Sequence, residues 1–170
     1  NFESTQGADT ASITYALNIG ENTDTGLHDT LTGNAISLSM VGGVVEGRAG
    51  DDLVFTISVD NNGNVTLDQL RAISHMDSDG NPLDSVGLNN QITLTATITD
   101  LDGDIAAANI NIAPTIAFQD QGPTINVAEA TLPVLSADEA SLGNNVVQSF
   151  AGNFESTQGA DTASITYALN

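Results

Sequence analysis

The chain has 170 residues, 22 of them acidic and only two basic, which gives a formal net charge of −20. That field repels nucleic-acid phosphates and anionic lipid headgroups, and no apolar run is long enough to span a bilayer, so we expect neither nucleic-acid binding nor membrane insertion. The hydrophobic content of 40% argues against disorder, and the absence of cysteine excludes disulfides and thiolate metal sites.

The opening segment of the chain is repeated at its other end. Residues 1–18 recur without a change as residues 153–170, an offset of 152 residues. Two copies of an old duplication would have diverged, so their identity predicts an array of near-identical units with a period of about 152 residues. We therefore expect neighbouring identical repeats in the same chain to be its partners, and its export to depend on sequence outside this piece.

Apolar and polar residues alternate along four segments, which predicts strands with one apolar face each. In chain order the apolar positions are Ala11, Ile13, Tyr15 and Leu17, then Ile36, Leu38 and Met40, then Leu53, Phe55, Ile57 and Val59, then Ile92, Leu94, Ala96 and Ile98. Asn61, Asn62 and Gly63 tolerate a positive φ and predict a hairpin after the third segment. Helical signals are confined to one capping pattern, Ser136 with Glu139. The sequence therefore predicts an all-β fold, an antiparallel β-sandwich.

The polar stretch around Gly122 and Pro123 is the best candidate for a linker. With that boundary, residues 1–122 are the later part of one repeat unit and residues 123–170 are the beginning of the next. Each part alone is then incomplete, and the two copies of the repeated segment compete for one place in a sheet. We expect residues 123–170 of one chain to complete residues 1–122 of another, a head-to-tail self-association by strand exchange.

An acidic loop after the fourth strand is the first candidate site. Asp100, Asp102 and Asp104 stand at alternate positions around Gly103. Alternate carboxylates beside a glycine turn can converge on one hard cation, so calcium (Ca²⁺) is the expected cofactor. The rest of the EF-hand pattern is missing, which excludes an EF-hand. A solvated turn is the alternative interpretation, because Asp and Gly are also ordinary turn residues.

A second acidic loop precedes the fourth strand. Its candidate ligands are Asp77, Asp79, Asn81 and Asp84, around another glycine. Calcium and a solvated turn are again the two interpretations.

The linker adds acidic groups of its own. The strand that follows Asp104 runs back toward the linker, so the first acidic loop lies at the pole away from its own linker. In an array, that pole is where the linker of the preceding unit arrives. We therefore expect Asp120, with Glu129 after it, to meet the Asp100–Asp104 loop of the following unit and to share a cation that fixes the angle between domains.

Catalytic and zinc chemistry are not indicated, and we expect no enzyme activity. Ser74, His75 and Asp77 contain the letters of a catalytic triad, but neighbours on one strand point to opposite faces and cannot assemble. His28 and His75 are isolated, which makes a poor zinc site. Both histidines are expected at the surface or in loops.

Residues 72–125 carry motifs that resemble the tandem repeats of type I-secreted RTX adhesins. In those repeats a His-x-Asp-x-Asp-Gly turn precedes a strand that ends Thr-Asp-x-Asp-Gly-Asp, and a linker with Asp and Pro closes the unit. The matching residues are His75, Asp77, Asp79 and Gly80, then Thr99, Asp100, Asp102, Gly103 and Asp104, then Asp120 and Pro123. The resemblance implies an Ig-like β-sandwich on the surface of a bacterium, with calcium at its domain junctions. The glycine-rich nonapeptides of RTX secretion ends are absent, so it implies an extender repeat.

We therefore expect a structural spacer repeat, rigidified by calcium, that holds the terminal binding domains of a giant adhesin away from the cell. The alternative is a sugar- or peptide-binding module in the same array. With two Tyr, five Phe and no Trp, the chain offers little of a stacking platform for a sugar.

Overall fold

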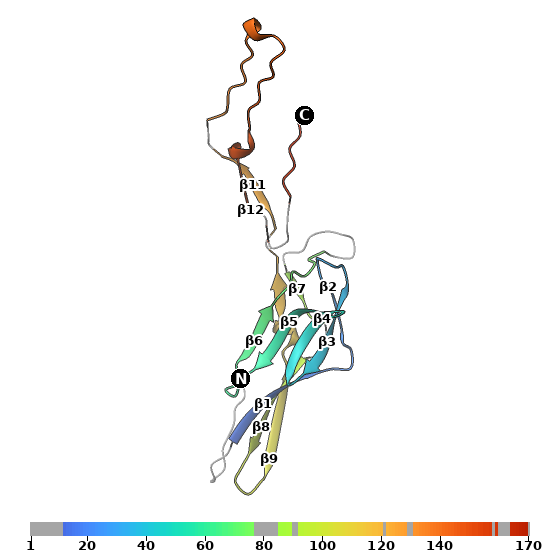
Figure 1. Cartoon of the computed structure of the whole chain (residues 1–170). Coiled ribbons are helices and arrows are strands. Elements are labelled where there is room, and N and C mark those ends of the chain that lie inside the picture. Colours follow the sequence, from blue (N-terminus) through green and yellow to red (C-terminus); the bar gives the residue numbers. More distant parts are fainter. Residues whose placement is uncertain are drawn as a thin grey trace. The chain divides into compact units, whose positions relative to one another are not determined.

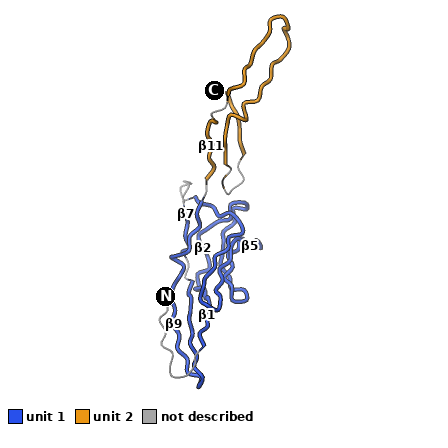
Figure 2. The backbone as a smooth tube through the Cα atoms, turned by 90° about the vertical axis from the view of Figure 1, so that its left-hand side faces the viewer, with its two compact units in different colours: residues 1–120 blue, residues 121–170 orange. Residues whose placement is uncertain are grey.

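Strands and single turns of 3₁₀ helix make up all regular structure in the described part of the chain, which confirms the all-β prediction. The computed structural model describes residues 12–76, 85–89, 92–120, 122–128, 131–157, 159 and 164–169. The chain divides into two units, residues 1–120 (unit 1) and residues 121–170 (unit 2), which Figure 2 shows in different colours. No helix within the described ranges has the length and apolar character needed to cross a membrane.

One sheet of unit 1 has three strands in the order β1-β8-β9, and all its pairs are antiparallel. The strands are β1 (Ser12–Ile19), β8 (Ile92–Thr99) and β9 (Ile105–Asn111). β1 pairs with β8 without a register shift, from Ser12 opposite Thr99 to Ile19 opposite Ile92. β8 is therefore the central strand, and β1 is an edge strand of this sheet.

The other main sheet of unit 1 has five strands in the order β2-β3-β4-β5-β6, so each strand pairs with the next along the chain. The strands are β2 (Asp24–His28), β3 (Ala35–Val41), β4 (Val44–Ala49), β5 (Asp52–Val59) and β6 (Val65–Gln69). The predicted hairpin joins β5 to β6. Its turn is held by Asp60, whose carboxylate accepts the backbone N–H groups of Asn62 at 2.8 Å and Asn64 at 2.9 Å.

The core of unit 1 lies between these two sheets (Figure 1), which makes the fold an antiparallel β-sandwich, as predicted. Leu17 and Leu94 are buried on the three-stranded side, and Ile36 and Ile57 are buried on the five-stranded side. Beyond the middle of β8 the burial ends. The last residues of β8 are half-buried and all of β9 is exposed, so the packed face predicted for the whole of β8 covers only its first half.

The predicted alternation in β5 is wrong at one point, because a bulge interrupts the strand. Gly47 pairs with Phe55 and Arg48 pairs with Leu53, which leaves Val54 as the extra residue. Val54 and Phe55 are both fully buried, while Leu53 is half-buried. The carbonyl of Val54 accepts the N–H groups of Leu70 and Arg71 instead of a ladder bond.

A short strand pair closes unit 1 before the linker. β7 (Ser85–Gly87) pairs with β10 (Ala117–Gln119), and one turn of 3₁₀ helix, η1 (Ala113–Thr115), connects β9 to β10. Phe118 of β10 is 1% exposed, and its ring lies against that of Phe55, with centroids 4.9 Å apart. This contact anchors the end of the unit in the core.

The described residues of unit 2 form one strand pair, β11 (Thr124–Val127) with β12 (Phe154–Thr157), and two single 3₁₀ turns, η2 (Glu139–Ser141) and η3 (Ala151–Asn153). The helical turn expected after Ser136 is present, but Asp138 caps it. The carboxylate of Asp138 accepts the N–H of Ala140 at 2.9 Å. Most apolar residues of unit 2 are exposed, in contrast to those of unit 1.

Candidate metal centre

The turn between β8 and β9 is closed by Asp100. The N–H of Asp100 donates to the carbonyl of Asp104 at 3.1 Å, and the N–H of Gly103 donates back to the carbonyl of Asp100 at 3.2 Å. Gly103 has a φ of +96°, which a residue with a side chain adopts only under strain. The Asp100 carboxylate also accepts the N–H of Asp104 at 2.8 Å, so its position is fixed by the turn itself.

Three carboxylates converge at this turn. One oxygen atom from each of Asp100, Asp102 and Asp104 lies within 4.8 Å of the other two. Asp100 is half-buried, and the other two are exposed. Spacing by two residues around a tight turn brings these groups to one side, as the sequence led us to expect. Three carboxylate oxygens so close together suit a hard cation such as calcium.

Hydrogen bonds lower the pKa of one member of the cluster. The pKa of the Asp100 carboxyl lies below its ordinary value of 3.8, first because of a side-chain hydrogen bond with Asp102, with smaller contributions from the backbone N–H groups of Asp104, Gly103 and Asp102. Desolvation opposes this shift. Asp100 is therefore ionised at neutral pH and available as an anionic ligand.

Asp120 does not join this cluster. It directly follows β10, whose partner β7 lies near the upper end of unit 1 in Figure 1, whereas the β8–β9 turn lies at the lower end. Asp120 is half-buried. The two acidic groups thus occupy opposite ends of unit 1, the arrangement that an array needs if the linker of one unit is to meet the loop of the next. Whether they share a cation stays a prediction.

The predicted ligands also include the second acidic loop and a residue after the linker. Asp77, Asp79, Asn81 and Asp84 of the second acidic loop, and Glu129 after the linker, lie outside the described residues. Asp77 of the rejected triad lies outside them as well.

The two histidines differ in their exposure to solvent. His28 is exposed at the end of β2, as expected. His75 is only 8% exposed, and its Nδ1 has no hydrogen-bond partner among the described residues. Of the two positions expected for His75, the loop is confirmed and the surface is not, because the side chain is buried in a loop next to buried Ile73.

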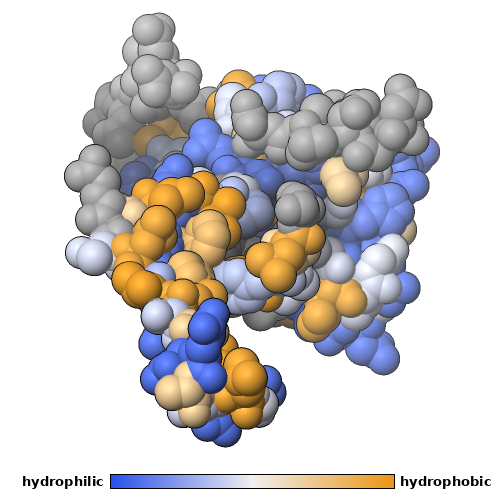
Figure 3. Space-filling model, turned by 90° about the horizontal axis from the view of Figure 1, so that it is seen from above, coloured by the Kyte–Doolittle hydropathy of each residue, from blue (hydrophilic) through white to orange (hydrophobic). Residues whose placement is uncertain are grey.

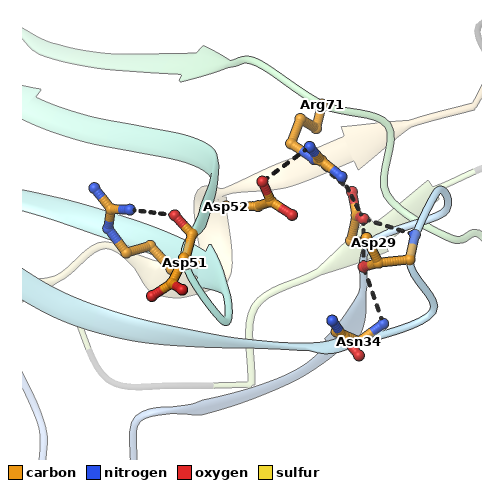
Figure 4. Close-up of polar contacts among 7 residues, drawn as sticks. Asp29, Asn34, Asp51, Asp52 and Arg71 are labelled. Carbon is orange, nitrogen blue, oxygen red and sulfur yellow. Dashed lines mark hydrogen bonds and ion pairs between the residues drawn. The ribbon is translucent and has the colours of Figure 1, made fainter.

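An ion pair that no sequence pattern predicts lies inside unit 1 (Figure 4). Asp29 is fully buried, and its two carboxylate oxygens accept Nε–H and Nη2–H of Arg71 at 2.9 and 2.8 Å. Thr32 donates its N–H and its hydroxyl to the same carboxylate at 2.9 and 2.6 Å. Nη1 of Arg71 also lies 3.3 Å from Oδ1 of Asp52. One of only two basic residues in the sequence thus neutralises a buried acid, which gives Arg71 a structural role.

Comparison with known proteins assigns the chain to a protein family. Neither the curated proteins nor the solved structures contain a match to this chain. A family model matches residues 1–113, which runs through both main sheets of unit 1 and includes the β8–β9 turn. The chain belongs to this family, which is described as a domain of unknown function, DUF5801.

Proposed function

We propose that this chain is a structural spacer repeat of a giant bacterial surface adhesin and that calcium stiffens the junctions between its repeats. The observation that carries the proposal is the convergence of Asp100, Asp102 and Asp104 at the end of unit 1 opposite Asp120. The exact recurrence of 18 residues supports a uniform array, and uniform length is what a spacer requires. The resemblance to RTX adhesin extender repeats supports an extracellular location.

The proposed mechanism is electrostatic. Without a cation, the carboxylates of the linker and of the Asp100–Asp104 loop repel one another, and the junction bends freely. Calcium coordinated between them replaces this repulsion with fixed metal–oxygen contacts and limits the angle between units. Extracellular calcium is millimolar, the range in which extracellular modules bind it, so the junction is stiff outside the cell.

Two measurements test the proposal. Calorimetric titration of this chain with calcium should give binding in the range of about 10⁻⁴ to 10⁻³ M, and the thermal midpoint of unit 1 should rise with calcium concentration. The chain carries one Asp100–Asp104 loop and one linker, so stiffening needs a tandem array of two full 152-residue periods. Small-angle scattering of that array should show a narrower, longer distance distribution in calcium than in chelator.

The outcome decides between the two function classes. A chelator that changes neither the thermal midpoint nor the distance distribution would overturn the calcium-stiffened spacer. Clear hits for the same array on a glycan or peptide panel, with no effect of calcium on shape, would favour the ligand-binding module instead.

A further inference from the structure

The two copies of one segment have different structures in this chain. Ser12–Leu17 lies in β1, paired with β8, and Leu17 is 3% exposed. The identical Ser164–Leu169 forms no strand, and Leu169 is fully exposed, at 104%. A segment that finds a partner strand in one copy is left without one in the other.

The second copy lies on an uncovered apolar surface of unit 2. It lines a cavity of about 690 Å³, whose apolar walls include Ile125, Phe150, Phe154, Ile165, Tyr167 and Leu169. The rings of Phe154 and Tyr167 are in contact, with centroids 5.9 Å apart. Each of these six residues is at least 36% exposed, and apolar residues show as orange on the open surface in Figure 3. A surface of this kind marks a place where something else packs.

Unit 1 has an uncovered surface of its own. All seven residues of β9 are exposed, although its neighbour β8 is buried at the start. Ile105 is 69% exposed and Ile110 is 40% exposed, and they lie on opposite faces of the strand. Within the described residues, the five-stranded sheet covers the first half of β8, and β9 is left exposed.

We propose that unit 2 of one chain docks on residues 19–120 of a second copy of this chain, where its Ser164–Leu169 takes the place of Ser12–Leu17 beside β8. The register of β1 fixes the new pairs: Tyr167 lies opposite Ala96 of the second copy, and Leu169 lies opposite Leu94. The exchange alone is close to neutral, because an identical segment makes the same backbone hydrogen bonds. Burial of the apolar surface of unit 2 supplies the driving force. Because the donor segment and the β8 edge that accepts it are different surfaces of the chain, the contact is heterologous and association is head to tail.

A cross-linking experiment tests the pairing directly, because the chain has no cysteine of its own. Two full-length variants, Ala96→Cys and Tyr167→Cys, are mixed and oxidised. Residues directly opposite in an antiparallel pair have the Cβ separation that a disulfide needs, so we expect a mixed disulfide dimer, identified by mass spectrometry. The matched control replaces Ala96→Cys with Thr97→Cys. Thr97 is half-buried like Ala96 but points to the other face of the sheet, so its mixture with Tyr167→Cys should not cross-link.

Sedimentation tests the driving force. The wild-type mass should rise with concentration, and Ile165→Asp with Leu169→Asp should abolish that rise while unit 1 keeps its thermal midpoint. Leu31→Asp, at a residue that is 81% exposed between β2 and β3, is the matched control for an added charge and should associate like the wild type. Wild-type monomers at every concentration, or a 96–167 disulfide that forms only within a chain carrying both substitutions, would overturn the proposal.

The strand exchange does not require calcium. The docked second copy would bring its own Asp100–Asp104 loop to the junction after Asp120, so tighter association in calcium is expected if the proposed function also holds. Association that is equal in calcium and in chelator leaves the strand exchange intact and contradicts only the calcium junction.

Discussion

Arg71 holds Asp29 in a two-point ion pair, with Nε–H and Nη2–H directed at the two carboxylate oxygens at 2.9 and 2.8 Å. Asp29 opens the loop between β2 and β3, while Arg71 follows β6 at the opposite edge of the same five-stranded sheet. Backbone bonds join the two segments as well, since the N–H of Thr30 donates to the carbonyl of Ala72 at 3.0 Å. The pair thus ties together the two edge strands of the sheet.

Removing the arginine should destabilise unit 1 strongly, because it leaves a buried carboxylate without its counter-charge. We expect Arg71→Met to lower the free energy of unfolding by about 3–5 kcal/mol. Arg48→Met is the control, because the side chain of its partner Glu46 is 14% exposed whereas that of Asp29 is fully buried. Its loss leaves a carboxylate that water still reaches, so it should cost clearly less than the loss of Arg71. Urea denaturation at pH 7 measures both, and equal losses would show that burial of Asp29 carries no penalty.

The same pair should make unit 1 sensitive to acid. Hydrogen bonds from Arg71, then from Thr32, hold the pKa of the Asp29 carboxyl far below its ordinary value of 3.8, against the opposing effect of desolvation. A carboxyl whose pKa is depressed in the folded state stabilises the fold above its unfolded pKa, and this contribution is lost as the pH falls toward the folded pKa. The free energy of unfolding should therefore decline as the pH falls below about 4.

The Asp29→Asn variant isolates that contribution. It should be less stable than wild type at pH 7, and its free energy of unfolding should change less between pH 4 and pH 2. Asp68→Asn, at an exposed position of β6, is the control and should keep the wild-type slope. An unchanged slope in Asp29→Asn would assign the acid sensitivity to other carboxylates.

The sequence predicts those features of this protein that depend on near neighbours. Alternation identifies β1, β3, β5 and β8, and Asn61 to Gly63 identify the β5–β6 turn, because strand faces and turns are set over a few residues. The meeting of Asp100, Asp102 and Asp104 follows from their spacing around Gly103 in the same way.

Features that depend on distant residues could not be predicted. Asp29 and Arg71 are 42 positions apart, and only the strand order brings them together. The bulge at Val54 buries this residue and leaves Leu53 half-buried, and the alternation of apolar and polar residues gives no sign of it. The prediction that Ser136 caps η2 was wrong for a different reason. Ser136 and Asp138 are both good capping residues, and Asp138, which is adjacent to the turn, accepts the hydrogen bond.

Calcium binding should depend on the carboxylate of Asp102, which can be replaced without removing the hydrogen bond between the Asp100 carboxylate and the N–H of Asp104. Asp100 is a poor test position, because its carboxylate also accepts the N–H of Asp104 and its loss would disturb the turn. We expect Asp102→Asn to weaken calcium binding at least tenfold, roughly the effect of removing even an outer partner of a metal ligand. Asp51→Asn, at an exposed residue between β4 and β5, removes the same charge elsewhere and should bind like wild type. Equal affinity in the two variants, measured by calorimetry, would mean that calcium binds outside this turn.

The approach of Gly47 to Phe55 should make the bulge region intolerant of even a methyl group. A Cβ at Gly47 would overlap ring atoms Cε1 and Cζ of Phe55, whose ring is confined by Phe118 on another side. We expect Gly47→Ala to cost about 1–3 kcal/mol, an overpacking effect. Gly122→Ala, with no atom within 4 Å of the new Cβ, is the control and should leave the thermal midpoint nearly unchanged.

A double-mutant cycle shows whether the confinement of the Phe55 ring is the cause. Phe118→Ala alone should cost about 3–5 kcal/mol, because it leaves a cavity beside Phe55. In that background the Phe55 ring has room to move away from position 47, so Gly47→Ala should cost clearly less than it does in wild type, a coupling between the two sites. Additive costs, measured by urea denaturation of all four chains, would show that the methyl group clashes with the backbone of the bulge and not with the confined ring.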